Sequence, residues 1–134
     1  MSGALKWRAG GCHCGAVRFE VQCVDAVTVS ECNCSMCRKT GFIHLIVDDA
    51  AFRITQGQDQ LTSYRFNTGV AEHLFCKNCG VKSIYHPRSR PTGWSVNVNA
   101  LDAPEALTLT MTVFDGKNWE QHFAGLSPED RYSV

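Results

Sequence analysis

The sequence predicts a single, mostly β domain over residues 1–134, with several short antiparallel sheets around metal sites and little helix. Three observations support this prediction. Successive segments alternate apolar and polar residues at period two and end in turn residues. A chain of 134 residues with 44% hydrophobic residues is long enough for one cored domain but too short for two ordinary ones. Seven of the eight cysteines fall in three short groups.

The strands expected in the first half are short and rich in valine, isoleucine and aromatic residues. In the first of them, Val17, Phe19 and Val21 share one face because strand side chains alternate. The predicted strand over residues 42–47 is more continuously apolar, as expected for a strand covered on both faces. The predicted strands cover residues 16–21, 26–30, 42–47 and 51–55, and residues 56–59 read as a turn.

The second half continues this pattern. Residues 67–69 form a short loop with a glycine, which is typical of a hairpin, and Asp115-Gly116 is expected to be a tight turn between two strands. Only residues 102–106 and 127–130 favour a helical turn, because each carries an early proline behind a capping residue. The predicted strands cover residues 61–66, 70–75, 81–86, 94–98, 107–113 and 117–123.

Composition excludes several classes of protein. Thirteen basic and thirteen acidic residues cancel, so no broad basic face for nucleic acid or an anionic membrane is expected. No apolar run reaches the length of a membrane span. Residues 1–8 lack the apolar core of a secretory signal, which favours the cytoplasm. Eight cysteines in a reducing compartment indicate metal binding or catalysis rather than disulfides.

The central cysteine group has the pattern CxCxxC and contains Cys32, Cys34 and Cys37. Three thiols on so short a span converge on one point when a metal holds them, and Zn²⁺ is the usual occupant because thiolates are soft ligands. Three ligands leave one vertex of a tetrahedron free. An open vertex distinguishes a catalytic zinc from a structural one.

The other two groups are a CxC pair and a CxxC-Gly knuckle, and together they hold Cys12, Cys14, Cys76 and Cys79. Two plus two ligands make a closed set of four thiolates. The alternative partition joins the knuckle to the central group and leaves the CxC pair without metal. Spacing favours the first arrangement, which gives two zinc sites. The remaining thiol, Cys23, is interpreted as a small buried residue.

These motifs resemble the glutathione-dependent formaldehyde-activating enzyme family. The resemblance spans residues 11–102 and is closest to the branch that holds the enzyme-like domain of centromere protein V. It is carried by the order and separation of the three cysteine groups and by Phe66-Asn67-Thr68 and Pro87-Arg88-Ser89. The resemblance implies an Mss4-like fold. It also implies a structural zinc on Cys12, Cys14, Cys76 and Cys79 and a catalytic-type zinc on Cys32, Cys34 and Cys37.

The function that this resemblance implies is a carbon–sulfur lyase-type reaction. The sulfur of glutathione would occupy the free vertex and attack an aldehyde, formaldehyde, to give S-(hydroxymethyl)glutathione, or the adduct would be cleaved. Glutathione carries two carboxylates, so cations near the site are candidate contacts. The candidates are Arg38, Lys39, Arg88 and Arg90.

Two further possibilities stay open at this point. His44 and His73, in predicted strands, are weaker candidates for supplying a proton or a fourth ligand. The alternative function is a non-enzymatic, zinc-stabilised module that binds a protein or a nucleic acid, because fold does not determine function. Nothing in the sequence points to a particular oligomeric state.

Overall fold

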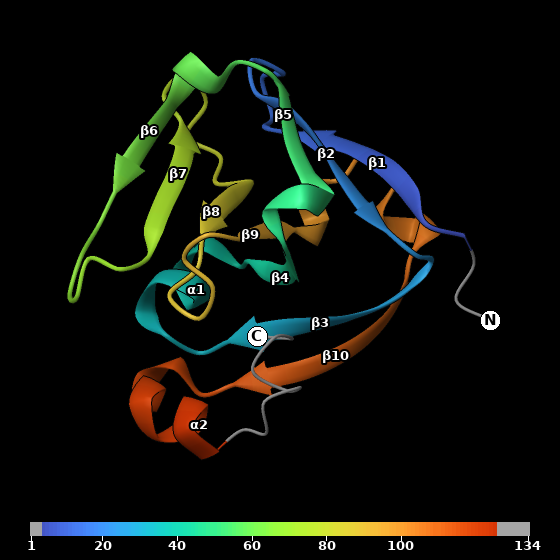
Figure 1. Cartoon of the computed structure of the whole chain (residues 1–134). Helices are drawn as coiled ribbons and strands as arrows, with labels where there is room; N and C mark the ends of the chain where they lie inside the picture. The colour runs from blue at the N-terminus through green and yellow to red at the C-terminus, as the bar shows by residue number, and fades with distance from the viewer. Residues whose placement is uncertain (1–3, 126–134) are drawn as a thin grey trace.

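The computed structural model describes residues 4–125, and within them ten strands form two sheets (Figure 1). The smaller sheet has the order β1-β2-β5, and both of its strand pairs are antiparallel. Its strands are β1 (Lys6–Gly11), β2 (Arg18–Cys23) and β5 (Phe52–Gln56). The predicted mostly β architecture is therefore confirmed, although β1 was not predicted.

The larger sheet has seven strands in the order β10-β3-β4-β9-β8-β7-β6. Its pairs are antiparallel except for the parallel pair of β10 and β3. The strands are β3 (Ala26–Cys32), β4 (Ile43–Val47), β6 (Leu61–Tyr64), β7 (Glu72–Cys76), β8 (Ile84–His86), β9 (Trp94–Asn97) and β10 (Thr108–Phe114).

The main core lies between the two sheets. Phe19 and Val21 of β2 are fully buried, as their alternation predicts. Phe52 stacks on Phe19 at a ring separation of 5.6 Å and on Trp94 at 4.4 Å, so aromatic rings join β2, β5 and β9. Large aromatic side chains bury the most apolar area per residue, which makes this stack the centre of the core.

The apolar positions of β10 differ from the expectation of a buried face. Leu109, Met111 and Val113 alternate, but they are 40%, 44% and 66% exposed. β10 is the last strand of its sheet, so little core extends beneath it. Leu107 and Phe114, on either side of this stretch, are the buried apolar residues.

Helical structure is limited to short segments. The helix α1 (Ser35–Thr40) follows β3, and α2 (Trp119–Gly125) follows β10. Single 3-10 turns lie at η1 (Asp49–Ala51), η2 (Gln58–Gln60), η3 (Val98–Ala100), η4 (Pro104–Ala106) and η5 (Gly116–Asn118). The turn predicted at residues 102–106 is present as η4, and the one at 127–130 lies outside the described residues.

The strand predicted over residues 117–123 is wrong, because the segment forms η5 and then α2. Its aromatic residues recur at helical spacing, and Trp119 stacks on Phe123 one turn later at 4.7 Å. The side chain of Asp115 accepts a hydrogen bond from Asn118 Nδ2 at 3.0 Å, and its backbone N–H donates to His122 Nδ1 at 3.0 Å. These contacts stabilise a helical conformation of the segment over an extended one.

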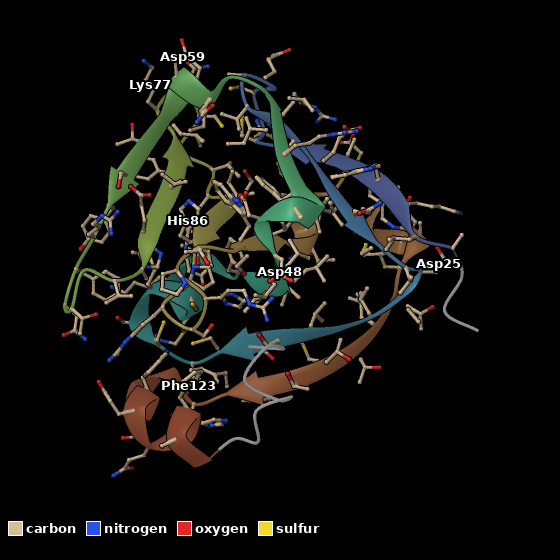
Figure 2. All side chains as sticks on the ribbon, in the orientation of Figure 1. Asp25, Asp48, Asp59, Lys77, His86 and Phe123 are labelled. Atoms are coloured by element: carbon tan, nitrogen blue, oxygen red, sulfur yellow. The ribbon has the colours of Figure 1, made fainter. Side chains whose placement is uncertain are left out.

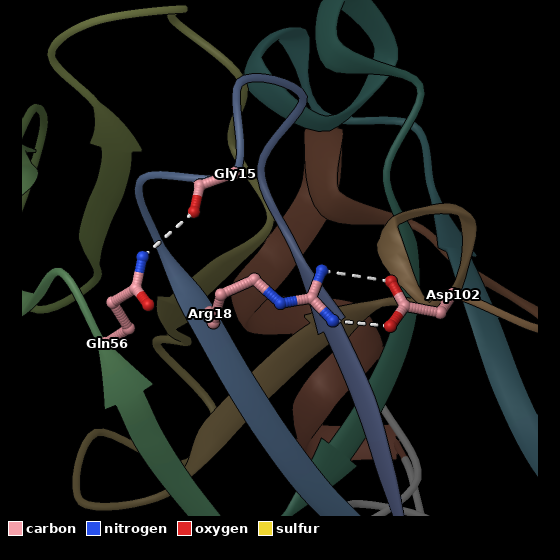
Figure 3. Close-up of polar contacts among 4 residues, drawn as sticks. All are labelled: Gly15, Arg18, Gln56 and Asp102. Carbon is pink, nitrogen blue, oxygen red and sulfur yellow. Dashed lines mark hydrogen bonds and ion pairs between the residues drawn. The ribbon is translucent and has the colours of Figure 1, made fainter.

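An ion pair joins the smaller sheet to the η3–η4 segment. Arg18 at the start of β2 donates two parallel hydrogen bonds to the carboxylate of Asp102 (Figure 3). In the same region, Gln56 Nε2 donates to the carbonyl of Gly15 at 3.2 Å, which ties the loop after β1 to the end of β5. No helix within residues 4–125 is long and apolar enough to cross a bilayer.

Candidate metal centres and active site

The first metal-binding candidate is the four-cysteine cluster, whose Sγ atoms all lie within 4.8 Å of one another. It joins the loop after β1 to the turn after β7. Backbone N–H groups stabilise its sulfurs, since Val17 donates to Cys12 Sγ at 3.3 Å and Asn78 donates to Cys76 Sγ at 3.4 Å. The cluster consists of Cys12, Cys14, Cys76 and Cys79, which is the partition that spacing favours.

Glycines let both loops of the four-cysteine cluster reverse tightly. Gly15 follows Cys14 with φ 81°, and Gly80 follows Cys79 with φ 77°. Residues other than glycine rarely adopt this left-handed backbone conformation, so glycine is the favoured residue at both positions. The backbone N–H groups around Cys79 also lower the pKa of that thiol to about 6, which favours the thiolate that a metal binds.

The second candidate is the three-cysteine cluster of Cys32, Cys34 and Cys37, with Sγ atoms again within 4.8 Å of one another. Cys32 ends β3, and Cys34 caps α1 by accepting a hydrogen bond from Cys37 N at 3.3 Å. Contacts with Cys32 and Cys37 hold the pKa of Cys34 well below its usual value. One short strand–helix junction therefore gathers all three thiols.

No fourth ligand completes the three-cysteine cluster in the part of the chain that the structure describes. Within residues 4–125, the group contains no other cysteine, histidine, aspartate or glutamate. Gly116 instead approaches the sulfurs closely. A Cβ at this position would lie 2.4 Å from Cys32 Sγ and 2.8 Å from Cys34 Cβ. Both clusters are donor sets that could hold a metal ion, and they differ in that one is closed and the other open.

A cavity of about 180 Å³ opens onto the three-cysteine cluster. Its walls come from the β6–β7 loop, the β8–β9 loop, η5 with α2, and the strands beside the cysteines. Besides the three cysteines, it is lined by Phe66, Asn67, Thr68, Ala71, Pro87, Arg88, Ser89, Gly116, Lys117, Trp119, Glu120, Ser30, His44, His73, Tyr85 and Phe114. A concave site with a reactive cluster on its wall is the usual form of a small-molecule site.

Two histidines lie in the inner wall of this cavity. His44 on β4 is buried, and its Nδ1 lies 3.0 Å from both Tyr85 Oη and Ser95 Oγ. Its Nε2 is buried without a hydrogen-bond partner. Burial lowers the pKa of His44 to about 3 and that of His73 to about 4, with Lys82 adding to both shifts.

Lys82 is a buried cation that sequence reasoning did not identify. Its Nζ lies 4.0 Å from the ring centroid of Tyr85 and 4.8 Å from that of Phe42, and it has no hydrogen-bond partner. Burial lowers its pKa to about 8, while the thiolates of the three-cysteine cluster oppose that shift. A lysine within a predicted strand looks like a surface residue, so only the folded packing reveals it.

The four cations predicted near the site occupy different places. Arg88 lines the cavity, where its guanidinium lies 3.9 Å from the Trp119 ring centroid and pairs with Glu120 at 2.7 Å. Arg90 pairs with Asp48 at 3.2 Å and does not line this cavity (Figure 2 labels Asp48). Arg38 and Lys39 are exposed on α1.

Arg38 borders a second cavity, of about 260 Å³, on another side of the three-cysteine cluster. Cys32 and Cys37 line this cavity too, together with Phe42 and Val113. Cysteines of the cluster thus line two cavities, the first bordered by Arg88 and Lys117 and the second by Arg38.

Comparisons with known proteins extend the resemblance seen in the motifs. Residues 7–117 match the model of the family described as glutathione-dependent formaldehyde-activating enzyme. A protein of Halomonas elongata named "Putative glutathione-dependent formaldehyde-activating enzyme" is 35% identical over 88 residues. That match covers 59% of this chain and 56% of the relative, so the matched part is little more than half of either protein.

A solved structure shows the same fold. The crystal structure of a Rhodobacter sphaeroides protein superposes with a TM-score of 0.66 at 34% sequence identity. The match covers 78% of this chain and 99% of that one.

Proposed function

Because the chain belongs to the glutathione-dependent formaldehyde-activating enzyme family, we propose that it makes or breaks the carbon–sulfur bond of S-(hydroxymethyl)glutathione at the three-cysteine cluster. One observation carries this proposal. The three sulfurs form part of the wall of a cavity, and no fourth ligand closes their group within residues 4–125. The rival function, a non-enzymatic zinc-stabilised module that binds protein or nucleic acid, gives no reason for a cavity at this cluster.

The metal that fits both clusters is zinc, because thiolates are soft donors and zinc takes them tetrahedrally. In the four-cysteine cluster, all four positions would be filled by protein sulfurs, which is the pattern of a structural site. At the three-cysteine cluster, a bound zinc would lower the pKa of a substrate thiol that reaches its free position. Glutathione and formaldehyde would be the substrates.

The residues of the cavity would bind and orient glutathione. Of the four candidate cations, Arg88 has the best support as a carboxylate contact because it lines the cavity. Trp119 and Glu120 hold its guanidinium in place. A pre-positioned guanidinium loses little side-chain entropy when it binds a carboxylate. Arg38 would contact a carboxylate of a ligand that extends into the second cavity. Neither Lys39 nor Arg90 lines either of the two cavities.

We place this reaction in the cytoplasm. Both clusters need reduced thiols, and all eight cysteines of this structure are free. A reducing compartment keeps them so and also supplies thiol substrates.

The test is exchange NMR on a mixture of glutathione and formaldehyde. Zinc-loaded protein should accelerate the interconversion of glutathione and its adduct above the spontaneous rate. The Cys37→Ser variant should keep one zinc per chain and lose the acceleration. Cys23→Ser is the matched control, because Cys23 is a buried cysteine outside both clusters. An unaccelerated exchange with fully loaded wild type would contradict the proposed substrate pair.

A further inference from the structure

His44 and the three cysteines line the same cavity, yet His44 is only 3% exposed. Its Nδ1 is held by Tyr85 and Ser95, and its Nε2 is the one ring nitrogen left without a partner. Burying a polar atom without a partner is costly, so such an atom calls for an explanation.

The contacts of His44 Nδ1 are compatible with a tautomer that carries the ring proton on Nε2. Burial raises the pKa of Tyr85 far above its usual value, so its hydroxyl keeps its proton. We assign that hydroxyl as the donor in its 3.0 Å contact with His44 Nδ1, which then acts as the acceptor. In a neutral imidazole the remaining proton lies on the other nitrogen. With this assignment, the ring presents an Nε2–H donor.

The surroundings keep this ring neutral near pH 7. Its pKa is lowered to about 3, first by burial and then by the charge of Lys82, with a smaller contribution from His73. The thiolate of Cys34 acts in the opposite direction. A neutral Nε2–H donates a hydrogen bond without adding a full charge to the site.

We propose that the Nε2–H of neutral His44 donates a hydrogen bond to the aldehyde oxygen while the carbon–sulfur bond forms, with Tyr85 and Ser95 as the residues that position it. This inference rests on the proposed function and names the group that acts on oxygen. The thiolate electron pair forms the carbon–sulfur bond, and the C=O π pair moves to oxygen. That oxygen takes a proton from water, which balances the proton that the thiol released to solvent. In reverse, the hydroxyl loses its proton and the carbon–sulfur bond breaks.

His73 provides a matched control in the same wall. Its ring stacks between Phe66 at 5.3 Å and Tyr85 at 4.9 Å, and its Nδ1 is buried without a partner. No hydroxyl contact like those on His44 fixes its tautomer. If any buried histidine near the sulfurs sufficed, the two residues would be equivalent. We expect them to differ, because only His44 has the two hydroxyl contacts at Nδ1.

Three variants test the proposal in exchange NMR: His44→Phe, His73→Phe and Tyr85→Phe. Loss of a donor to a developing oxyanion lowers kcat about 10²- to 10³-fold. We expect a loss near 10²-fold for His44→Phe, with KM for glutathione and two zincs per chain retained. His73→Phe, in the same cavity wall, should lower kcat less than His44→Phe does. Tyr85→Phe keeps the ring but not the hydroxyl, so it should fall between the two.

A second readout does not depend on activity. Nitrogen-15 NMR of the histidine rings in the zinc-loaded protein should show His44 as the Nε2–H tautomer, and Tyr85→Phe should shift this equilibrium. An Nδ1–H tautomer in wild type would overturn the proposal, and so would an unchanged rate in His44→Phe. Loss of one zinc in His44→Phe would make this residue a metal ligand instead.

These outcomes separate two failures. If wild type does not accelerate the exchange, the proposed function fails and the role of His44 fails with it. If wild type accelerates the exchange and His44→Phe does so equally, only the role of His44 fails.

Discussion

The two cysteine clusters use the same side chain but are assembled in opposite ways. The four-cysteine cluster joins residues 62 positions apart, as the contact of Cys14 Sγ with Cys76 Sγ at 3.7 Å shows. The three-cysteine cluster comes from a single strand–helix junction. The first cluster can form only when much of the fold has formed, whereas the second needs little more than its own segment.

We propose that this difference separates a structural role for the four-cysteine cluster from a chemical role for the three-cysteine cluster. Closing a long loop with a bound metal restricts the unfolded chain and stabilises the fold. A local cluster removes little chain entropy, so its sulfurs contribute less to folding, and its open position remains available to a ligand. The cavity lies at the local cluster, as this division would require.

The largest expected effect is a difference between Cys76→Ser and Cys37→Ser in folding. A structural zinc contributes on the order of 10 kcal/mol in small domains, and a whole domain is stable by only about 5–15 kcal/mol. We therefore expect Cys76→Ser to lose its cooperative thermal transition, and Cys37→Ser to keep one. Circular dichroism melts with metal stoichiometry by mass spectrometry measure both.

Chelation gives the same comparison without mutation. Stepwise addition of a chelator should first remove one zinc, while the near-ultraviolet circular dichroism spectrum stays unchanged. The protein should unfold only when the second zinc is removed. Simultaneous loss of both metals and the fold would show that the two clusters do not differ in this way.

The sequence predicted the parts of this comparison that depend on local patterns. Alternation located Val17, Phe19 and Val21 on one face, and all three are fully buried. Residues 67–69 lie within the longer loop, residues 65–71, that joins β6 and β7 as a hairpin, and Asn67 and Gly69 have positive φ. Cysteine spacing indicated which thiols belong together. Each of these features is encoded within a few residues.

Very short elements and features that depend on distant contacts were not predicted. The helix α1 has six residues and is held by the Cys34 cap, so it is too short to show helical periodicity. β1 carries few apolar residues and exists through its pairing with β2. Lys82 packs against Phe42, and Trp119 packs against Arg88, each from a distant part of the chain. Period-two and cysteine patterns carry no information on such contacts.

The next effect concerns the close contact of Gly116 with the three-cysteine cluster. Gly116→Ala places a Cβ 2.4 Å from Cys32 Sγ, so the sulfurs must shift. Changes around a metal site typically reduce affinity about 10- to 100-fold, and we expect this range for the second zinc alone. Competition with a coloured chelator measures it. Gly125→Ala is the control, since nothing lies within 4 Å of its new Cβ. Equal weakening of both zincs would contradict the separation of the clusters.

A smaller effect is expected at the mouth of the cavity. Arg88→Gln removes a guanidinium that lines the cavity, and loss of a hydrogen bond to a charged group costs about 1.5–3 kcal/mol. We expect KM for glutathione to rise at least about tenfold, with both zincs retained. Arg90→Gln is the matched control because Arg90 pairs with Asp48 outside this cavity. A fall in kcat with unchanged KM would argue against carboxylate binding by Arg88.

The smallest effect should come from the ion pair of Arg18 and Asp102, which lies next to the four-cysteine cluster. Arg18 directly follows Val17, whose N–H donates to Cys12 Sγ. Both side chains are partly exposed, at 33% and 52%, so water screens the pair. A double-mutant cycle with Arg18→Gln and Asp102→Asn in urea should give a coupling of about 0.5 kcal/mol, with activity unchanged. A coupling above about 2 kcal/mol would exceed the value of an exposed pair. It would mean that this clamp, together with the metal, holds the four-cysteine cluster closed.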